Sequence, residues 1–234
     1  MKAVVFDFFG TLSDPSAESG REELYRATGQ VLGVDPAKFW TEMSASFADR
    51  ITGRLGDTNA TLAEVAARCG GSPSPENLAE AVVLQLANAA LVQRPHPKAY
   101  DVLSWVRARG LRTALVSDCS SELVELWPHH PLAPLLDEAV FSWEQGYRKP
   151  DARMFTTAVD RLGLSREDCW YVGDGGGREI YGSAQAGLTP ILVTNAHYPG
   201  AAAFRDAPDN HLPTHHIPDL SALPDLMSTF GVRS

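Results

Sequence analysis

Short apolar segments alternate with helical segments along most of this chain, and this alternation restricts the possible folds more than any other feature. The predicted strands cover residues 4–6, 112–117, 139–141, 170–172 and 190–194. The predicted helices among them cover residues 97–109, 152–162, 179–186 and a short stretch from 220 onwards. Strands that alternate with helices are typical of a parallel sheet covered on both faces. We therefore predict an α/β fold.

One long stretch, residues 15–95, departs from the alternation and has helical character throughout. Proline-marked joints bound it, Asp14-Pro15 at one end and Arg94–Pro97 at the other. Four helices are predicted inside it, at 16–31, from 36 through 47, at 62–69 and at 74–91, with Ser74 and either Thr58 or Asn59 as N-caps. We predict a helical domain of residues 15–95 inserted into a core domain of residues 1–14 and 96–234.

Composition and charge exclude several classes of partner. The chain has 234 residues, 44% of them hydrophobic, which is enough for a substantial core. Its net charge of −9 argues against binding to nucleic acid or to an anionic membrane. Neither a long apolar run nor a leader pattern at the N-terminus is apparent, so we expect a cytoplasmic protein. The sequence leaves monomer and homodimer open.

Polar side chains follow the predicted strands at the points where those strands end. Asp7 follows the first strand, the second ends in Ser117-Asp118, the third leads to Lys149 a few residues later, and Asp174 follows the fourth. The carboxyl ends of parallel strands lie at one edge of a sheet, so these groups should meet in one crevice. An acid nucleophile, a hydroxyl, an amine and a second acid together predict a site for a small anionic substrate.

The glycine run at residues 173–177 also invites a different interpretation, a loop that binds a dinucleotide. Two residues argue against it. Arg178 stands where the third glycine of that motif is needed, and Asp174 would repel a pyrophosphate group.

In these motifs the chain resembles the haloacid dehalogenase superfamily. Residues 7–11, Asp-Phe-Phe-Gly-Thr, resemble the first motif of that family and Ser117 the second. Residues 149–151, Lys-Pro-Asp, resemble the third, and Gly173-Asp174 with Glu179 resembles the fourth. The resemblance implies a Rossmann-like core with a helical cap inserted after the first motif, in agreement with the two domains predicted above.

The resemblance also implies a role for each residue. Asp7 would attack the substrate and form a covalent intermediate, Ser117 would hold the transferred group, and Lys149 would neutralise developing charge. Mg²⁺ would be held by Asp7, Asp174 and the backbone carbonyl of Phe9, with Glu179 orienting the cluster. The expected substrate contacts also include Phe8, Thr11 and Asp118.

Phe9 departs from the pattern of the superfamily's phosphatases, which normally have a second Asp at this position as the general acid. A phenyl ring cannot transfer a proton, and general acid catalysis typically contributes about 10²–10⁴-fold. The 2-haloacid dehalogenases of the superfamily also have an aromatic residue here, but they have Ser and Asn in place of Gly173-Asp174. We therefore favour a Mg²⁺-dependent phosphatase-type hydrolase acting on a small phosphorylated metabolite. The alternatives are a 2-haloacid dehalogenase and a non-catalytic binding protein.

Substrate choice should depend on the inserted helices, since the core supplies chemistry common to many substrates. The predicted turn at residues 50–56 carries two arginines that could bind an anionic group, and Arg54 is the candidate that we select. The competing interpretation is that both arginines are ordinary solvated charges.

Overall fold

The computed structural model describes residues 1–198, 206–209 and 213–231, and within them it confirms the predicted parallel α/β sheet. Six strands pair in the order β3-β2-β1-β4-β5-β6, and each neighbouring pair is parallel. The strands are β1 (Ala3–Phe6), β2 (Arg112–Ser117), β3 (Glu138–Phe141), β4 (Cys169–Gly173), β5 (Thr189–Val193) and β6 (His215–Ile217). The last of these was not predicted, because its three residues include two histidines and form no apolar run.

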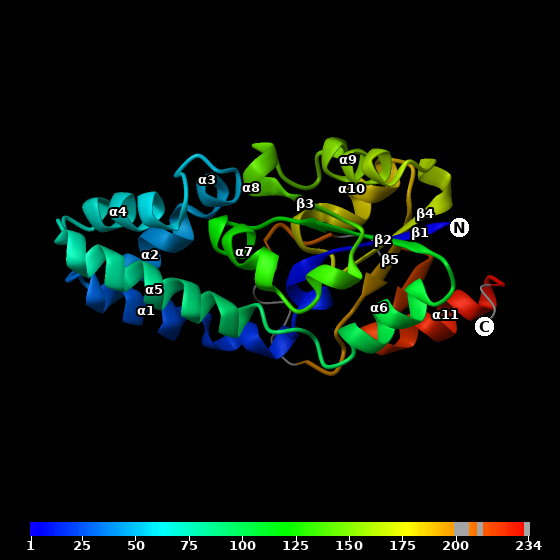
Figure 1. The fold of residues 1–234 in the computed structure, drawn as a ribbon, viewed down its shortest axis with the longest axis horizontal. Coiled ribbons are helices and arrows are strands. Elements are labelled where there is room, and N and C mark those ends of the chain that lie inside the picture. The colour runs from blue at the N-terminus through cyan, green and yellow to red at the C-terminus, as the bar shows by residue number, and fades with distance from the viewer. Residues whose placement is uncertain (199–205, 210–212, 232–234) are drawn as a thin grey trace.

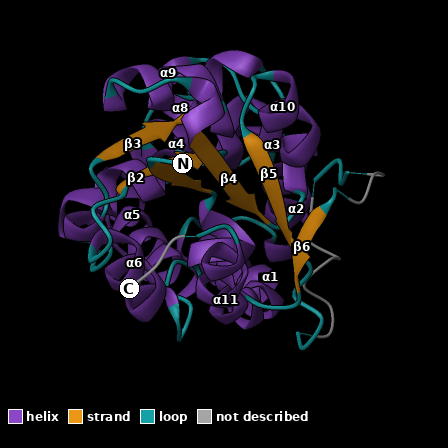
Figure 2. Cartoon of the chain, turned by 90° about the vertical axis from the view of Figure 1, so that its right-hand side faces the viewer, coloured by secondary structure: helices purple, strands orange, loops and turns teal. Residues whose placement is uncertain are grey.

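Helices cover both faces of the sheet (Figure 2). One face packs against α6 (Ala99–Arg107), α7 (Ser121–Leu126) and α11 (Leu223–Thr229), and the other against α9 (Ala152–Leu162) and α10 (Glu179–Gln185). Alternate residues of β1 serve the two layers: Val4 and Phe6 belong to the first apolar cluster, Ala3 and Val5 to the second. The central strand is therefore buried on both sides, as its uninterrupted apolar sequence predicts.

Residues 15–95, which we call the helical segment, occupy one end of the molecule (Figure 1). Its α-helices are α1 (Arg21–Val31), α2 (Pro36–Ala45), α3 (Phe47–Ile51), α4 (Thr58–Arg68) and α5 (Pro75–Val92). The short α3 was not predicted as a separate helix. The segment has its own apolar cluster, made of Leu32, Phe39, Met43, Leu62, Val65, Ala66 and Ala81. The prediction of Thr58 or Asn59 as the N-cap of α4 was wrong, because Asp57 caps this helix and its side chain accepts from the Ala60 N–H at 2.8 Å.

The chain leaves and re-enters the sheet region at one place. Ser13 and Pro95 form an antiparallel bridge, and the N–H of Asp14 donates to the Arg94 carbonyl at 2.9 Å. At a second contact, Ser142, the first residue of the short α8 (Ser142–Gln145), donates from its Oγ to the Ile51 carbonyl at 2.6 Å. The helical segment thus contacts the remainder of the molecule both at its joint and beside the carboxyl edge of the sheet. Among the described residues no helix combines the length and apolar character that a membrane crossing requires.

Candidate active site

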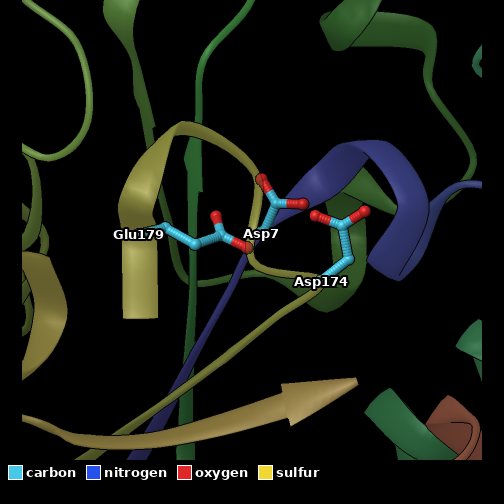
Figure 3. Close-up of side chains that lie close together, drawn as sticks. All are labelled: Asp7, Asp174 and Glu179. Carbon is cyan, nitrogen blue, oxygen red and sulfur yellow. The ribbon is translucent and has the colours of Figure 1, made fainter. Parts of the chain in front are cut away.

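Three acidic side chains meet at the carboxyl edge of the sheet (Figure 3). Asp7 directly follows β1, Asp174 directly follows β4, and Glu179 is the first residue of α10. One carboxylate oxygen from each lies within 4.8 Å of those of the other two, and all three residues are buried. The sequence therefore placed Asp7 and Asp174 correctly at a common point.

Gly10 allows this close approach. Its φ of +74° lies in the left-handed region, and a Cβ atom at this position would lie 2.5 Å from Asp174 Oδ2. The turn after β1 can therefore pass against the Asp174 carboxylate only because residue 10 has no side chain. The glycine in the sequence motif has a packing role as well as a conformational one.

Lys149 provides a positive charge beside this acidic group. Its Nζ donates to Asp7 Oδ1 at 2.6 Å and to Glu179 Oε2 at 2.5 Å, and the side chain is 3% exposed. Burial by itself would lower the pKa of Lys149, but Asp7 and Glu179 outweigh it and raise that pKa well above its usual value. Burial, reinforced by the Glu179 charge, raises the pKa of Asp7. One ammonium group thus faces an excess of negative charge.

Glu179 uses both of its oxygens within the protein. Oε2 accepts from Lys149 and from the Tyr171 hydroxyl at 2.7 Å, while Oε1 accepts from the Gly175 N–H at 2.9 Å. In this arrangement Glu179 orients Lys149 and the loop that carries Asp174. This geometry fits the positioning role that the family resemblance implies for Glu179. The side chain is longer than the Asp that usually stands at this position in the haloacid dehalogenase superfamily.

Asp118 and Ser117 come from the end of β2. Asp118 Oδ1 accepts from the backbone N–H of Lys149 at 3.0 Å, and the residue lines the cavity described below. Burial raises the pKa of Asp118 to about 6, against the lowering effect of the Lys149 charge. The Ser117 hydroxyl is buried and has no hydrogen-bond partner within the described part of the chain.

The residues that follow Asp7 are placed differently from one another. The Phe8 ring is fully buried and packs edge-on against Trp127 and His130, with ring centroids 6.1 and 5.3 Å away. Thr11 is fully buried as well. Neither residue is found in the cavity lining, so any contact of theirs with substrate would have to use the backbone. The Phe9 ring does line the cavity, with the Arg21 guanidinium 5.4 Å from its centroid.

A cavity of about 400 Å³ opens over the acidic cluster, between the sheet and the helical segment. The sheet side includes Asp7, Asp118, Lys149 and Asp174, and the helical side includes Arg21, Tyr25, Trp40, Phe47 and Arg50. Its size lies within the usual range for small-molecule sites. Substrate that reaches Asp7 would therefore touch residues from both parts of the molecule.

The structure distinguishes between the two arginines of the predicted turn. Arg54, the residue that we selected, has a 70% exposed side chain, pairs with Asp49 at 3.0 Å and is not part of the cavity lining. Arg50 lines the cavity, as does Arg21 near the start of the helical segment. Sequence reasoning missed Arg21, which lies in a charged helical stretch where an arginine is usually solvated.

The donor set suits a hard divalent cation. Asp7 and Asp174 offer carboxylate oxygens at close range, and two buried carboxylates repel one another strongly unless a positive charge stands between them. Carboxylate, carbonyl and water oxygens are the ligands that Mg²⁺ prefers. These residues therefore fit the ion that the sequence predicts.

Comparisons with known proteins agree with this arrangement. The curated glyceraldehyde 3-phosphate phosphatase of Methanopyrus kandleri is 27% identical over 209 residues, which cover 85% of this chain and 86% of that protein. The (S)-2-haloacid dehalogenase of Pseudomonas putida is 25% identical over 183 residues, 74% of this chain and 75% of that protein.

Solved structures show the same fold. The 2-haloacid dehalogenase of Pseudomonas syringae pv. Tomato DC3000 superposes with a TM-score of 0.70 at 22% identity, covering 98% of this chain and 99% of that one. A phosphatase from Thermococcus onnurineus gives 0.66 at 19% identity, covering 97% and 98%. A family model for haloacid dehalogenase-like hydrolases matches residues 1–187. This match covers most of the chain and establishes that the chain belongs to the haloacid dehalogenase-like hydrolase family.

Proposed function

We propose that this hydrolase cleaves the phosphate ester of a small phosphorylated metabolite and that it depends on Mg²⁺. One observation carries the proposal: the Asp7 and Asp174 carboxylates lie in one buried cluster, with Lys149 beside Asp7. A phosphoryl group brings further negative charge to this point. A metal cation and the Lys149 ammonium group would supply the positive charge that binds the phosphoryl group.

Asp7, Asp174 and the backbone carbonyl of Phe9 would hold the metal. When bound, Mg²⁺ would offset the repulsion between the carboxylates and stabilise the charge of a phosphoryl group. We assign the remaining chemistry to the chain's own side chains.

In the proposed reaction the Asp7 carboxylate attacks phosphorus, and the bond from phosphorus to the ester oxygen breaks. Water then attacks the phosphorus of the resulting acyl phosphate, which releases inorganic phosphate and regenerates Asp7. Lys149 holds Asp7 through the 2.6 Å contact at Oδ1. The Ser117 hydroxyl would donate to a phosphoryl oxygen.

The leaving oxygen needs a proton that Phe9 cannot supply. We assign this role to Asp118, which lines the cavity and has a pKa of about 6, raised by burial with a smaller raising effect from Glu179 and opposed by Lys149 and Arg148. A carboxyl group with this pKa is partly protonated near neutral pH and can act as a general acid.

The helical segment would act as a cap over this site. The two chain connections to this segment lie side by side, at Ser13 and Pro95. Residues of the segment also form part of the cavity wall. Opening at this joint would admit substrate, and closure would exclude water during the transfer.

Activity with p-nitrophenyl phosphate and Mg²⁺ tests the proposed function. We expect phosphate release that stops when EDTA removes the metal, and no release from Asp7→Asn. An inactive wild-type protein under these conditions, or activity that EDTA leaves unchanged, would contradict the proposal.

A leaving-group comparison tests the role of Asp118. Asp118→Asn should lower kcat by about 10²-fold or more for an alkyl phosphate, which needs a proton on its leaving oxygen. It should change the rate little for p-nitrophenyl phosphate, whose leaving group is a weak base. For the wild-type protein, activity toward the alkyl ester should fall as the pH rises above about 6, because the acid loses its proton. Equal losses with both esters would remove Asp118 from the role of proton donor.

One observation favours a second candidate function, a 2-haloacid dehalogenase. Phe9 places an aromatic ring in the cavity where a phosphatase of this family normally carries an acid, and a halide leaves without a proton. Incubation with 2-chloropropionate and EDTA distinguishes the two functions. Chloride release in the absence of metal would replace the phosphatase assignment.

A further inference from the structure

Arg50 is a buried cation that forms no close ion pair with the described residues. Arg50 is 4% exposed, and its guanidinium has no carboxylate of the described residues within 4 Å. Nε and Nη2 donate to a single acceptor, the Met43 carbonyl, at 3.3 and 3.1 Å. The rings of Tyr25 and Phe47 lie 5.9 Å from the guanidinium carbon. A buried guanidinium that has no carboxylate within hydrogen-bond distance is costly, which points to a ligand that supplies this contact.

The remaining donor group of Arg50 is available to a ligand. Nη1 makes no hydrogen bond to the described residues, and the surrounding protein does not fully bury this atom. Arg50 also lines the same cavity as Asp7. A ligand bound there would therefore meet one guanidinium edge on the helical side while its reacting group lies on the sheet side.

The surrounding charges decide which kind of anion fits. Arg21, the other arginine of the cavity, already pairs with Glu18 at 2.7 Å. Buried Glu122 also lies near Arg50. Burial by itself would raise the pKa of Glu122, but the Arg50 charge helps to lower it. With these acids present, the positive charge left for a ligand is small. A singly charged carboxylate matches it better than a doubly charged phosphate does.

We infer that Arg50 binds a carboxylate of the substrate, so that the preferred substrates are small phosphate monoesters that carry a carboxylate at the end remote from the phosphate. The inference rests on the proposed function, because it places the phosphoryl group at Asp7 and Lys149. The rings of Phe9, Tyr25 and Trp40 line the cavity as well and suit a short carbon chain between the two charged groups.

Binding of matched phosphonates tests the inference without any variant and without turnover. Calorimetry in the presence of Mg²⁺ would compare 3-phosphonopropionate with propylphosphonate, which lacks the carboxylate. We expect the first to bind about 10-fold to 100-fold more tightly, as charge-assisted hydrogen bonds typically provide. Equal affinities would overturn the inference. Tighter binding of 1,2-ethylenediphosphonate than of 3-phosphonopropionate would overturn the choice of carboxylate over a second phosphate.

Variants then assign the preference to Arg50. Arg50→Gln should bring the two phosphonate affinities to within about twofold of each other, and Arg50→Lys should restore part of the difference by returning the charge without the planar fork. Arg26→Gln is the matched control, because Arg26 belongs to the same helical segment and pairs on the surface with Glu22. Circular dichroism would verify that each variant folds. A preference that survives in folded Arg50→Gln would exclude Arg50 as its source.

Kinetics separate this inference from the proposed function. With phosphoglycolate as substrate, Arg50→Gln should raise KM about 10-fold or more and leave kcat nearly unchanged, because binding of a remote group is similar in the ground state and the transition state. With 2-hydroxyethyl phosphate KM should not change. Hydrolysis of both esters with equal KM values would defeat the inference alone. Phosphonate discrimination without hydrolysis of any phosphate ester would defeat the proposed function alone.

Discussion

Gly10 illustrates how one residue controls the geometry of this site. The turn that follows Asp7 requires a positive φ at residue 10 and passes so close to Asp174 that a methyl group has no room. Gly33 provides a natural comparison, since its φ of +70° is similar but no atom lies within 4 Å of a Cβ built there. The two positions separate backbone strain from steric overlap.

We predict that Gly10→Ala abolishes most of the activity, because the new methyl group displaces the Asp174 carboxylate in addition to the backbone strain. Gly33→Ala should cost only the strain, about 1–2 kcal/mol of stability, with kcat unchanged. Urea unfolding and assays with p-nitrophenyl phosphate measure both effects. Equal activity in the two variants would show that the approach to Asp174 is unimportant.

Glu179 and Tyr171 separate the charge of the network from its hydrogen bonds. Glu179→Gln removes the negative charge that faces Lys149, whereas Tyr171→Phe removes the 2.7 Å hydroxyl contact and keeps the ion pair. We expect kcat to fall about 10-fold to 100-fold in Glu179→Gln and much less in Tyr171→Phe, since partners that orient a metal site typically have effects of this size. Steady-state kinetics at saturating Mg²⁺ give the comparison. A larger loss in Tyr171→Phe would contradict this ranking.

At the scale of elements, local capping signals account for the ends of several helices. Ser74 precedes Pro75 and accepts from the Asn77 N–H at 3.1 Å, so α5 begins where the sequence predicts. Asp35 caps α2 in the same way, accepting from Lys38 N–H at 2.7 Å. These interactions depend only on residues close in sequence.

Ser74→Ala should therefore lower the free energy of unfolding by about 1 kcal/mol, because one N–H at the start of α5 loses its acceptor. Ser72→Ala is the control, since Ser72 is exposed and lies outside any helix. Thermal and urea unfolding, followed by circular dichroism, provide the measurement. Equal destabilisation by both substitutions would argue against the cap.

At the scale of the whole molecule, His130 links the end of the helical segment to the core of the sheet. The Nε2–H group donates to the Gln93 carbonyl at 3.0 Å, and Nδ1 accepts from the Leu132 N–H at 3.3 Å, which requires the neutral ring. The ring stacks on Trp127 at 5.2 Å. Burial lowers the pKa of His130, and the bond to Gln93 opposes that effect only in part.

This pKa shift predicts a specific dependence of stability on pH. Since the pKa of His130 is lower in the folded protein than in the unfolded chain, the unfolded state binds more protons as the pH falls below about 6.5, and the contribution of His130 to stability decreases there. His130→Gln should remove this contribution. The difference in unfolding free energy between wild type and His130→Gln should therefore shrink from pH 7.5 to pH 5.5, and a constant difference would contradict the assignment.

Sequence patterns were sufficient to predict the parallel α/β sheet and the edge of the sheet at which Asp7 and Asp174 meet. An apolar strand such as Val4–Phe6 that is followed by a polar residue indicates a buried strand whose polar residue lies at the carboxyl edge of the sheet. The carboxyl ends of parallel strands lie at the same edge whatever the details of packing. Asp7, Lys149 and Asp174 could be placed together for this reason alone. The two proline-marked joints lie beside the Ser13–Pro95 bridge, while the division into two domains stays a prediction.

The tertiary structure decided what depends on neighbours distant in sequence. Arg50 and Arg54 lie in one short stretch with similar sequence signals, yet only the fold buries the first beside Tyr25 and leaves the second exposed beside Asp49. The strand β6 likewise exists because β5 offers it an edge, since its own residues carry no strand pattern. Periodicity and capping are properties of adjacent residues, whereas burial, charge compensation and strand pairing arise only when separate segments meet.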